Sequence, residues 1–221
     1  MAESASSQWW LNSGGEFDDQ GAGGATIQGD LPSDNVWHQR YAQSSPTDTD
    51  GGSHPQNLFR LIDRRTFQNP IEHLEFNITS IHTSGSPNRN NSNGVLLMQH
   101  YQVDGQTLYY AGVRVDGQAV IKKKINGIYH TLAIRPIYPG RYNRQNNPNL
   151  IPTGQWIALD VSTRTNGDGS VTVDLSVDGT LTLEAVDNGH LGGPPLREAG
   201  FVGIRTDFMD VDFRNYNASE Q

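Results

Sequence analysis

Phenol, imidazole and ammonium side chains are concentrated in one stretch of the sequence, residues 94–137. It contains a run of three lysines, Lys122 to Lys124, and the aromatic and histidine residues His100, Tyr109, Tyr110, Tyr129 and His130. Imidazole and phenol groups can take up and donate protons, and ammonium groups can bind an anion. This set of groups suits the removal of a proton next to a carboxylate, provided that folding brings them onto one surface.

The dipeptides that interrupt this stretch are typical of tight turns. Asp104-Gly105, Asp116-Gly117 and Asn126-Gly127 separate four segments of β character. Asn-Gly and Asp-Gly favour two-residue hairpin turns, because both central positions need a positive φ. The sequence therefore predicts a four-stranded antiparallel meander.

The flanking sequence also favours strands. Apolar and polar residues alternate in 58–63 and 71–81, as they do in half-buried strands. After a loop at 138–152, further strands are expected at 156–164, 170–177, 180–185 and 200–216. Only 34% of the residues are hydrophobic, 24 are glycine, and no long helical periodicity occurs. We therefore expect an all-β fold, a two-sheet antiparallel β-sandwich of the jelly-roll kind, as a single domain over 1–221, with an irregular N-terminal wrap (1–55) and a sandwich core (57–216).

Charge and composition exclude several classes of protein. The net charge is −8, which argues against binding to nucleic acid or to an anionic membrane surface. No apolar run is long enough to span a bilayer, and the absence of cysteine excludes disulfides and thiolate chemistry. Glycosylation-type triplets at Asn77, Asn90 and Asn217 favour an extracellular protein, although residues 1–8 lack a signal-peptide pattern.

Three segments carry a resemblance to a known superfamily. They read GVLLMQHYQ…LYYAGVRVDGQAVIKKKINGIYHTLA, then WIALDVSTRTNGDGSVTVDLSVDG, then GFVGIRTDFMDVDFRNY. Their order resembles the concanavalin A-like jelly-roll superfamily over Asn57–Tyr216, which includes laminin-G-like modules, carbohydrate-binding domains and polysaccharide lyases. The resemblance lies in the layout of strands and turns, and it implies a carbohydrate-related function. The Arg-[Ser/Thr]-Glu-Leu-Arg motif of one alginate lyase family is absent.

Counting outward from the turns assigns the meander residues to two faces. The first face carries His100, Tyr109, Lys124, Tyr129, Met98, Ala111, Lys122 and Thr131, with Gln118 and Arg135 further along. The second carries Gln99, Tyr110, Lys123, His130, Leu97, Gly112, Ile121 and Leu132, with Arg114 further along. Burying two unpaired lysines costs more than burying one. We therefore expect the second face to lie toward the core and the first to line a cleft.

The first face has the groups that β-elimination from a uronic-acid polysaccharide requires. A tyrosine would act as base and acid, a histidine as base or carboxylate partner, and the cations would bind the substrate. The candidate catalytic residues are His100, Tyr109, Tyr129 and Lys124, and the candidate substrate-binding residues are Lys122, Arg135, Gln118, Arg141 and Tyr142. If the second face were the cleft, the set would be Gln99, Tyr110, Arg114, Lys123 and His130. The leading hypothesis is a lyase for a glucuronan- or alginate-like polysaccharide that needs no cofactor.

Other interpretations remain open. Alternating tyrosine and lysine also occur on ordinary solvated sheets, and a non-catalytic carbohydrate-binding or laminin-G-like module is the main alternative. A third is an interaction domain that pairs through its sheet edges. Glycoside hydrolysis is disfavoured, because the meander carries acidic residues only at turns, and Glu72 and Glu75 fall on opposite faces of their strand.

Two further features have alternative interpretations. Glu16, Asp18 and Asp212 offer hard oxygen ligands near the two chain ends, which suits a structural calcium ion, or they are solvated turn carboxylates. The loop at 138–152, with Arg141 and Tyr142, would either wall a sugar cleft or cap one end of the sandwich. A monomer is expected.

Overall fold

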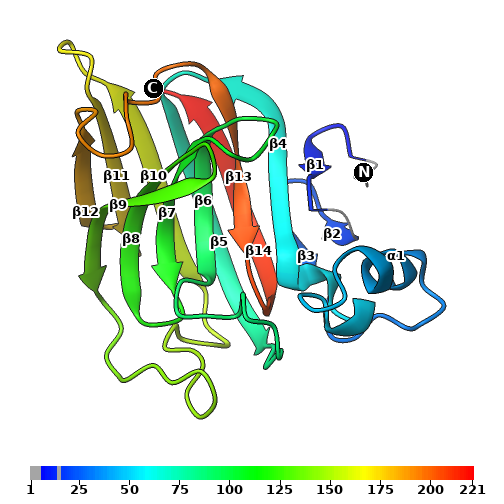
Figure 1. The fold of residues 1–221 in the computed structure, drawn as a ribbon. Helices are drawn as coiled ribbons and strands as arrows, with labels where there is room; N and C mark the ends of the chain where they lie inside the picture. The colour runs from blue at the N-terminus through cyan, green and yellow to red at the C-terminus, as the bar shows by residue number, and fades with distance from the viewer. Residues whose placement is uncertain (1–5, 14–15) are drawn as a thin grey trace.

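The computed structural model describes residues 6–13 and 16–221, which form two antiparallel sheets packed face to face (Figure 1). Sheet A has the strand order β1 (Trp9–Leu11), β4 (Phe59–Phe67), β13 (Gly200–Thr206), β6 (Gly94–Tyr101), β7 (Leu108–Arg114), β8 (Gln118–Ile125) and β9 (Ile128–Pro136). Sheet B has the order β12 (Thr180–Asp187), β11 (Val171–Val177), β10 (Ile157–Thr165), β5 (Pro70–Ile81), β14 (Met209–Glu220), β3 (Gly24–Thr26) and β2 (Phe17–Asp19). The predicted all-β jelly-roll sandwich is confirmed.

The N-terminal wrap adds strands to both sheets. β1 pairs with β4 in sheet A, and β3 pairs with β14 in sheet B. The helix α1 (Val36–Ser44) and the 3-10 turns η1 (Asp50–Gly52) and η2 (Pro55–Leu58) follow, with α1 standing beside the sandwich in Figure 1. Residues 1–5 and 14–15 of the predicted wrap lie outside the described residues. No helix in the described part of the chain has the length and apolar character needed to cross a membrane.

Alternation along the strands fills the space between the sheets. On β5 the inward residues Leu74, Phe76 and Ile78 are fully buried, whereas Glu75 between them faces outward and pairs with Arg214. The period of two puts every second side chain into the core. The interior of sheet A, however, also contains polar side chains, and their placement depends on the register of the meander.

The hairpin turns confirm part of the predicted register. At Asn126-Gly127 both residues have positive φ (50° and 83°), and Lys124 pairs with Tyr129 as expected. Between β7 and β8, however, the connection has three residues, and only Gly117 among them has a positive φ (81°). A three-residue connection that ends in a left-handed residue is a common alternative to the two-residue turn.

This extra residue shifts β7 by one position against its neighbours. Tyr109 pairs with Lys123 and Tyr110 with Lys122, whereas the predicted partners were Lys124 and Lys123. Between β6 and β7 a six-residue connection shifts the pairing again, so that Gln99 lies opposite Tyr109. The two shifts cancel between β6 and β8. The predicted register was therefore wrong for β7, and Tyr109 and Tyr110 exchange faces.

The middle lysine of the run lies inside the sandwich, as predicted for the second face. The Lys123 side chain is 0% exposed, and its Nζ lies 2.7 Å from the carboxylate of Asp187 on β12. It also donates to the carbonyls of Leu191 and Gly193, at 3.1 and 2.6 Å. Tyr109 donates a hydrogen bond to the same carboxylate. One buried ion pair thus joins the two sheets and holds the loop that follows β12.

Replacement of Lys123 tests this link. We expect Lys123→Ala to reduce the free energy of unfolding by about 3–5 kcal/mol, because it leaves a buried carboxylate without its counter-charge. Lys122→Ala, a change at the adjacent half-exposed lysine, should cost less than about 1 kcal/mol. Urea unfolding of both variants measures the difference, and equal stabilities would contradict the structural role of the Lys123 pair.

Candidate functional site

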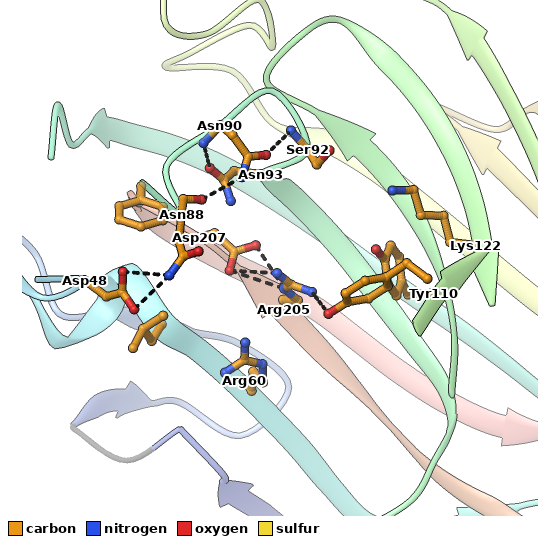
Figure 2. Close-up of a pocket in the computed structure, with 13 residues that line it drawn as sticks. Asp48, Arg60, Asn88, Asn90, Ser92, Asn93, Tyr110, Lys122, Arg205 and Asp207 are labelled. Atoms are coloured by element: carbon orange, nitrogen blue, oxygen red, sulfur yellow. Dashed lines mark hydrogen bonds and ion pairs between the residues drawn. The ribbon is translucent and has the colours of Figure 1, made fainter. Parts of the chain in front are cut away.

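A pocket of about 450 Å³ lies on the outer face of sheet A, where the meander meets two loops (Figure 2). We call it the Tyr129 pocket. Strands β4, β7, β8, β9 and β13 and the loops around residues 48, 90 and 207 contribute its lining: Asp48, Leu58, Arg60, Asn88, Asn90, Ser92, Asn93, Tyr110, Lys122, Tyr129, Arg205, Asp207 and Phe208. It therefore has a rigid side made of strands and a second side made of loops.

The strand side presents two phenols and one lysine, Lys122, and Lys124 lies beside it against the Tyr129 ring. The rings of Tyr110 and Tyr129 meet edge to face, with centroids 5.8 Å apart and planes at 68°. Tyr129 is 45% exposed, whereas Tyr110 is buried beneath it. The Nζ atoms of Lys124 and Lys122 lie 5.0 and 5.9 Å from the centroid of the Tyr129 ring. The exposed phenol therefore lies among cations.

An arginine forms the floor between the two sides. Arg205 and Asp207 are two residues apart at the end of β13, a spacing that places both side chains on the outer face. Their charges are paired, with Arg205 Nε donating to the carboxylate at 2.9 Å, and the Asp207 side chain is 3% exposed. A second guanidinium nitrogen of Arg205 approaches the hydroxyl of Tyr129 at 3.5 Å. Most of this arginine's charge is thus matched within the protein.

The loop side is held by short polar side chains. Asn88 donates to the Asp48 carboxylate at 3.0 and 3.2 Å, a contact drawn in Figure 2, and the Ser86 hydroxyl donates to the same group. The Asn93 side chain accepts a hydrogen bond of 2.6 Å from the backbone of Asn90. Asn and Ser side chains stabilise turns by bonding to nearby backbone groups. The loop therefore keeps a defined shape and presents amide groups to the pocket.

The electrostatic environment favours the ionised form of Tyr129. Burial by itself raises the pKa of Tyr129, but the nearby Arg205 and Lys124 more than offset this and lower the pKa below its usual value. The pKa of Tyr110 is raised, chiefly by burial. The pKa of Lys122 is lowered, first by burial and then by Arg114. Two neighbouring phenols therefore differ in acidity, and the exposed one is the stronger acid.

Five of the predicted residues point to the inner side of sheet A, away from this pocket, and all of them except the partly exposed His130 are buried. They are Gln99, Tyr109, Lys123 and His130, which share one inward row, and His100. His100 turns inward because the chain takes a left-handed conformation there (φ 53°), and its ring contacts the carbonyl of Glu198 at 2.8 Å and the hydroxyl of Thr163 at 3.0 Å. Burial lowers the pKa of His100 and, together with Asp187, raises that of Tyr109. The predicted catalytic set is therefore divided between two faces.

The remaining predicted residues of the cleft are scattered. Lys122, Lys124 and Tyr129 come together at the pocket with Tyr110, which the sequence had assigned to the other face. Arg135 pairs with the core residue Ala119, so it leaves β9 on the opposite side from Lys122. Four others lie outside the pocket lining: Gln118, Arg114, Arg141 and Tyr142.

The loop at 138–152 caps the sandwich and lines none of the Tyr129 pocket. Ile151 of this loop is 3% exposed and belongs to the core, and Tyr138 and Tyr142 of the same loop pack against the core. Arg144 in this loop donates to the carbonyls of Gly85 and Ser86, at 3.1 and 2.5 Å. The loop thus supports the back of the 84–93 segment, while that segment faces the pocket.

Sequence reasoning found only Tyr110, Lys122 and Tyr129 among the residues that line the pocket. Arg205 and Asp207 were within a predicted closing strand, and their spacing of two was the signal that they share a face. Arg60 pairs directly with Arg205 across β4 and β13, a contact that needs knowledge of strand order. Asp48 and Asn88 come from segments 40 residues apart, and no local pattern in the sequence connects them.

The predicted calcium ligands Asp18 and Asp212 lie on one row of sheet B, because both pair with Ala25 of β3. Burial and the nearby Asp210 raise the pKa of Asp212. Within residues 6–13 and 16–221, no three His, Asp or Glu side chains are grouped so as to hold a metal ion. A calcium site that includes Glu16 stays a prediction, and the functional proposals below do not depend on it.

The acidity of Tyr129 can be measured directly. We expect Lys124→Met to raise the pKa of Tyr129, because a positive charge beside the phenolate is removed. Ultraviolet titration of tyrosinate absorbance measures the shift, and Tyr129→Phe identifies which transition belongs to this residue. Arg141→Met, on the capping loop, is the control. Lys123→Met cannot serve as the control, because Lys123 is structural. A Tyr129 titration that is the same in Lys124→Met and wild type would contradict the electrostatic argument.

Comparison with known proteins places the fold but not a family. No family model and no curated protein matches the chain. The carbohydrate-binding module CBM66 from Bacillus subtilis aligns over 99% of both chains, with a TM-score of 0.58 and 14% identity. A Bacillus subtilis protein of unknown function with a galectin-like fold aligns over 95% of this chain and 88% of its own, with a TM-score of 0.53 and 12% identity. A GH43 protein from Bacillus licheniformis aligns over 98% of this chain but only 38% of its own, with a TM-score of 0.50 and 10% identity. The jelly-roll sandwich fold expected from the sequence is thus confirmed.

Proposed function

We propose that this protein binds a polysaccharide in the Tyr129 pocket, and that the preferred ligand is an acidic polysaccharide with uronic acid residues. The observation that carries the proposal is the grouping of Tyr129, Lys122 and Lys124 on one outer face of an acidic protein. The phenol ring offers an apolar surface for a sugar ring, and the lysines offer charge for its carboxylate.

The charge balance of the pocket supports an anionic ligand. Its lining has three cations, Arg60, Lys122 and Arg205, and two anions, Asp48 and Asp207. Asp207 is paired with Arg205, and Asp48 already accepts hydrogen bonds from the loop. Among the described residues, no carboxylate lies within ion-pair distance of Lys122. Its ammonium group is therefore available to a bound carboxylate.

The remaining groups suit sugar hydroxyls. Asn88, Asn90 and Asn93 supply amides that can both donate and accept hydrogen bonds. Aromatic rings combined with a few directed polar groups are the usual lining of a ligand site. The alignment with a carbohydrate-binding module over nearly its whole length also supports the proposal, since both chains consist of one sandwich of similar size. A polysaccharide ligand favours an extracellular location.

Binding is tested with polyglucuronate and alginate oligosaccharides by calorimetry. We expect Lys122→Ala to weaken binding about tenfold, because one charge-assisted hydrogen bond is lost, and Tyr129→Ala to weaken it by a similar factor. Higher ionic strength should weaken binding to the wild type, and neutral oligosaccharides of the same length should bind less tightly. Arg141→Ala, on the capping loop, is the matched control for charge and should bind like wild type. Equal affinity for neutral and acidic chains would contradict the preference for uronic acid.

The lowered pKa of Tyr129 favours a second candidate function, β-elimination at the same site. The Tyr129 phenolate would take the C5 proton of a uronate, electrons would form the C4–C5 double bond, and the C4–O bond to the next sugar would break. The phenol would then return its proton to the leaving oxygen, so that charge and protons balance. Lys122 would neutralise the substrate carboxylate as the C5 proton leaves. His100 and Tyr109, which the sequence suggested for these roles, are buried on the inner side of sheet A and do not line the Tyr129 pocket.

The two functions are distinguished by their products. If elimination occurs, incubation with a polyuronate should release unsaturated oligosaccharides, detected by their ultraviolet absorbance and by mass. Tyr129→Phe should then reduce the rate by at least about a hundredfold, the usual contribution of an acid–base group, while binding stays within a few-fold of wild type. Activity should rise with pH as the phenol ionises. Binding without any unsaturated product across glucuronan, alginate and pectate would leave the protein as a binding module.

A further inference from the structure

Two histidines stack on each other behind the loop side of the Tyr129 pocket. The rings of His54 and His82 are 4.2 Å apart between centroids, with planes at 29°. His54 precedes η2, and His82 follows β5, so the stack joins the N-terminal wrap to the sandwich. His82 is 7% exposed. The sequence gives no indication of this pair, since the two residues are far apart in the chain.

Both ring nitrogens of His82 face hydrogen-bond acceptors. Nδ1 lies 2.6 Å from the side-chain oxygen of Asn57, and Nε2 lies 2.9 Å from Asp210. The orientation of the Asn57 amide is fixed, because its nitrogen donates to the Asp48 carbonyl at 2.9 Å and to the Asp50 carboxylate at 3.0 Å. A neutral imidazole has only one N–H, so two acceptors are satisfied only by the doubly protonated, cationic ring.

The partner of His82 on β14 is a carboxylate rather than a carboxylic acid. Asp210 also accepts hydrogen bonds from Gln56 at 3.0 Å and from the backbone of Gly29 at 2.8 Å. Burial by itself raises the pKa of Asp210, but the bonds from His82, Gln56 and Gly29 lower it overall. The carboxylate thus uses its lone pairs for three donors, and the proton between it and His82 belongs to the imidazole.

His54 has the same arrangement. Its Nδ1 lies 2.9 Å from Asp50, and its Nε2 contacts the carboxylate of Asp30. Burial tends to raise the pKa of Asp50, but hydrogen bonds from Ser84, His54 and Asn57 lower it overall. The other charged or titratable groups near the stack are Arg89, Tyr142 and Asp207, which line a small cavity with His82. Three carboxylates, those of Asp30, Asp50 and Asp210, thus lie against the nitrogens of the two stacked rings.

The stack is connected to the pocket through a short series of hydrogen bonds. Asn57, which accepts from His82, donates to the backbone of Asp48, and the Asp48 side chain accepts from Asn88 in the pocket wall. A second connection runs from the Ser84 hydroxyl to Asp50 at 2.6 Å. The segments at 46–58 and 82–93, which form the loop side of the pocket, are thus joined at the two histidines.

We propose that the stacked pair His54 and His82 is a pH-sensitive clasp that holds the loop side of the Tyr129 pocket in place. When His82 loses a proton, one of its nitrogens presents a lone pair to an acceptor. Asn57 can restore a bond to that nitrogen only by rotating its amide, which breaks its two donor bonds to Asp48 and Asp50. Loss of the proton therefore releases the contact that positions Asp48 and Asn88. The effect on ligand affinity rests on the function proposed for the pocket, but the clasp itself does not.

The sign of the pH dependence follows from these groups. The hydrogen bonds of the cationic rings are present where the imidazoles are protonated and are lost as the pH rises. On the acid side, Asp50 and Asp210 have lowered pKa values, so their contribution to stability is present above the ordinary carboxyl range and is lost as the pH falls through the lowered values. The clasp is closed between these limits and opens toward alkaline pH.

Two measurements on the protein without ligand test the clasp. Nitrogen NMR of the histidine rings should show both nitrogens of His82 protonated at mildly acidic pH, and a single neutral tautomer there would overturn the proposal. Hydrogen exchange, corrected for the intrinsic effect of pH, should show the backbone of 46–58 and 82–93 opening at least about tenfold more readily at alkaline than at mildly acidic pH. Exchange of β10 and β11 should not change in this way.

Variants separate the clasp from general stability and from ligand binding. In His82→Gln, which can donate to only one of the two acceptors, exchange in the two segments should be fast and independent of pH over this range. His190→Gln, at an exposed histidine outside the cluster, should keep the wild-type dependence. The proposal would be overturned if hydrogen exchange in the two segments depended on pH equally in the wild type and in His82→Gln. Because none of these measurements uses a ligand, failure of the polysaccharide proposal would leave the result for the clasp intact.

Discussion

The structure depends on how the charge of Lys123 is accommodated between two sheets. An ammonium group without water or a counter-charge would cost several kcal/mol, and Asp187 from the opposite sheet together with two backbone carbonyls removes most of that cost. Because side chains alternate along a strand, the inward position of Lys123 forces Lys122 and Lys124 outward. Side chains alternate along β7 in the same way. Tyr109, opposite Lys123, therefore lies beside the ion pair, and Tyr110, opposite Lys122, lies on the outer face. The strand side of the Tyr129 pocket and the buried salt bridge thus lie on opposite faces of the same strands.

The two sides of the pocket differ in their physical basis. Strands of sheet A fix the phenols and lysines, and their backbone hydrogen bonds leave little freedom for these groups to move. The loop side depends on side-chain contacts among Asp48, Ser86 and Asn88, and on the histidine stack behind them. In the function that we propose, such a site would combine a rigid surface for a sugar ring with a loop wall that responds to pH. The 138–152 loop packs on the core and holds the 84–93 segment through Arg144.

Buried polar groups in this protein fall into two kinds. Glu72, in the interior, is held by neutral donors: burial raises its pKa well above the usual value, while hydrogen bonds from Tyr216 and Gln99 oppose that rise. Lys123, Asp210 and Arg205 instead keep their charges by pairing. Groups of the second kind lie at the edges of the core, next to loops. The placement of charge at these edges is what links the sandwich to the segments that line the pocket.

The sequence by itself determined the fold class, the positions of most strands and the outward direction of Lys122 and Lys124, because periodicity and turn residues are local properties of the chain. It also correctly separated Glu72 from Glu75, since the alternation within one strand needs no partner. The pairing of β7 was decided by the length of two connections, and a difference of one residue there exchanged Tyr109 with Tyr110 and divided the predicted catalytic set. The left-handed turn at His100, the pairing of Arg60 with Arg205, and the meeting of Asp48 with Asn88 and of His54 with His82 were decided only by the tertiary structure. These contacts join residues far apart in the chain, and their energies depend on burial and on charged partners that no local sequence pattern specifies.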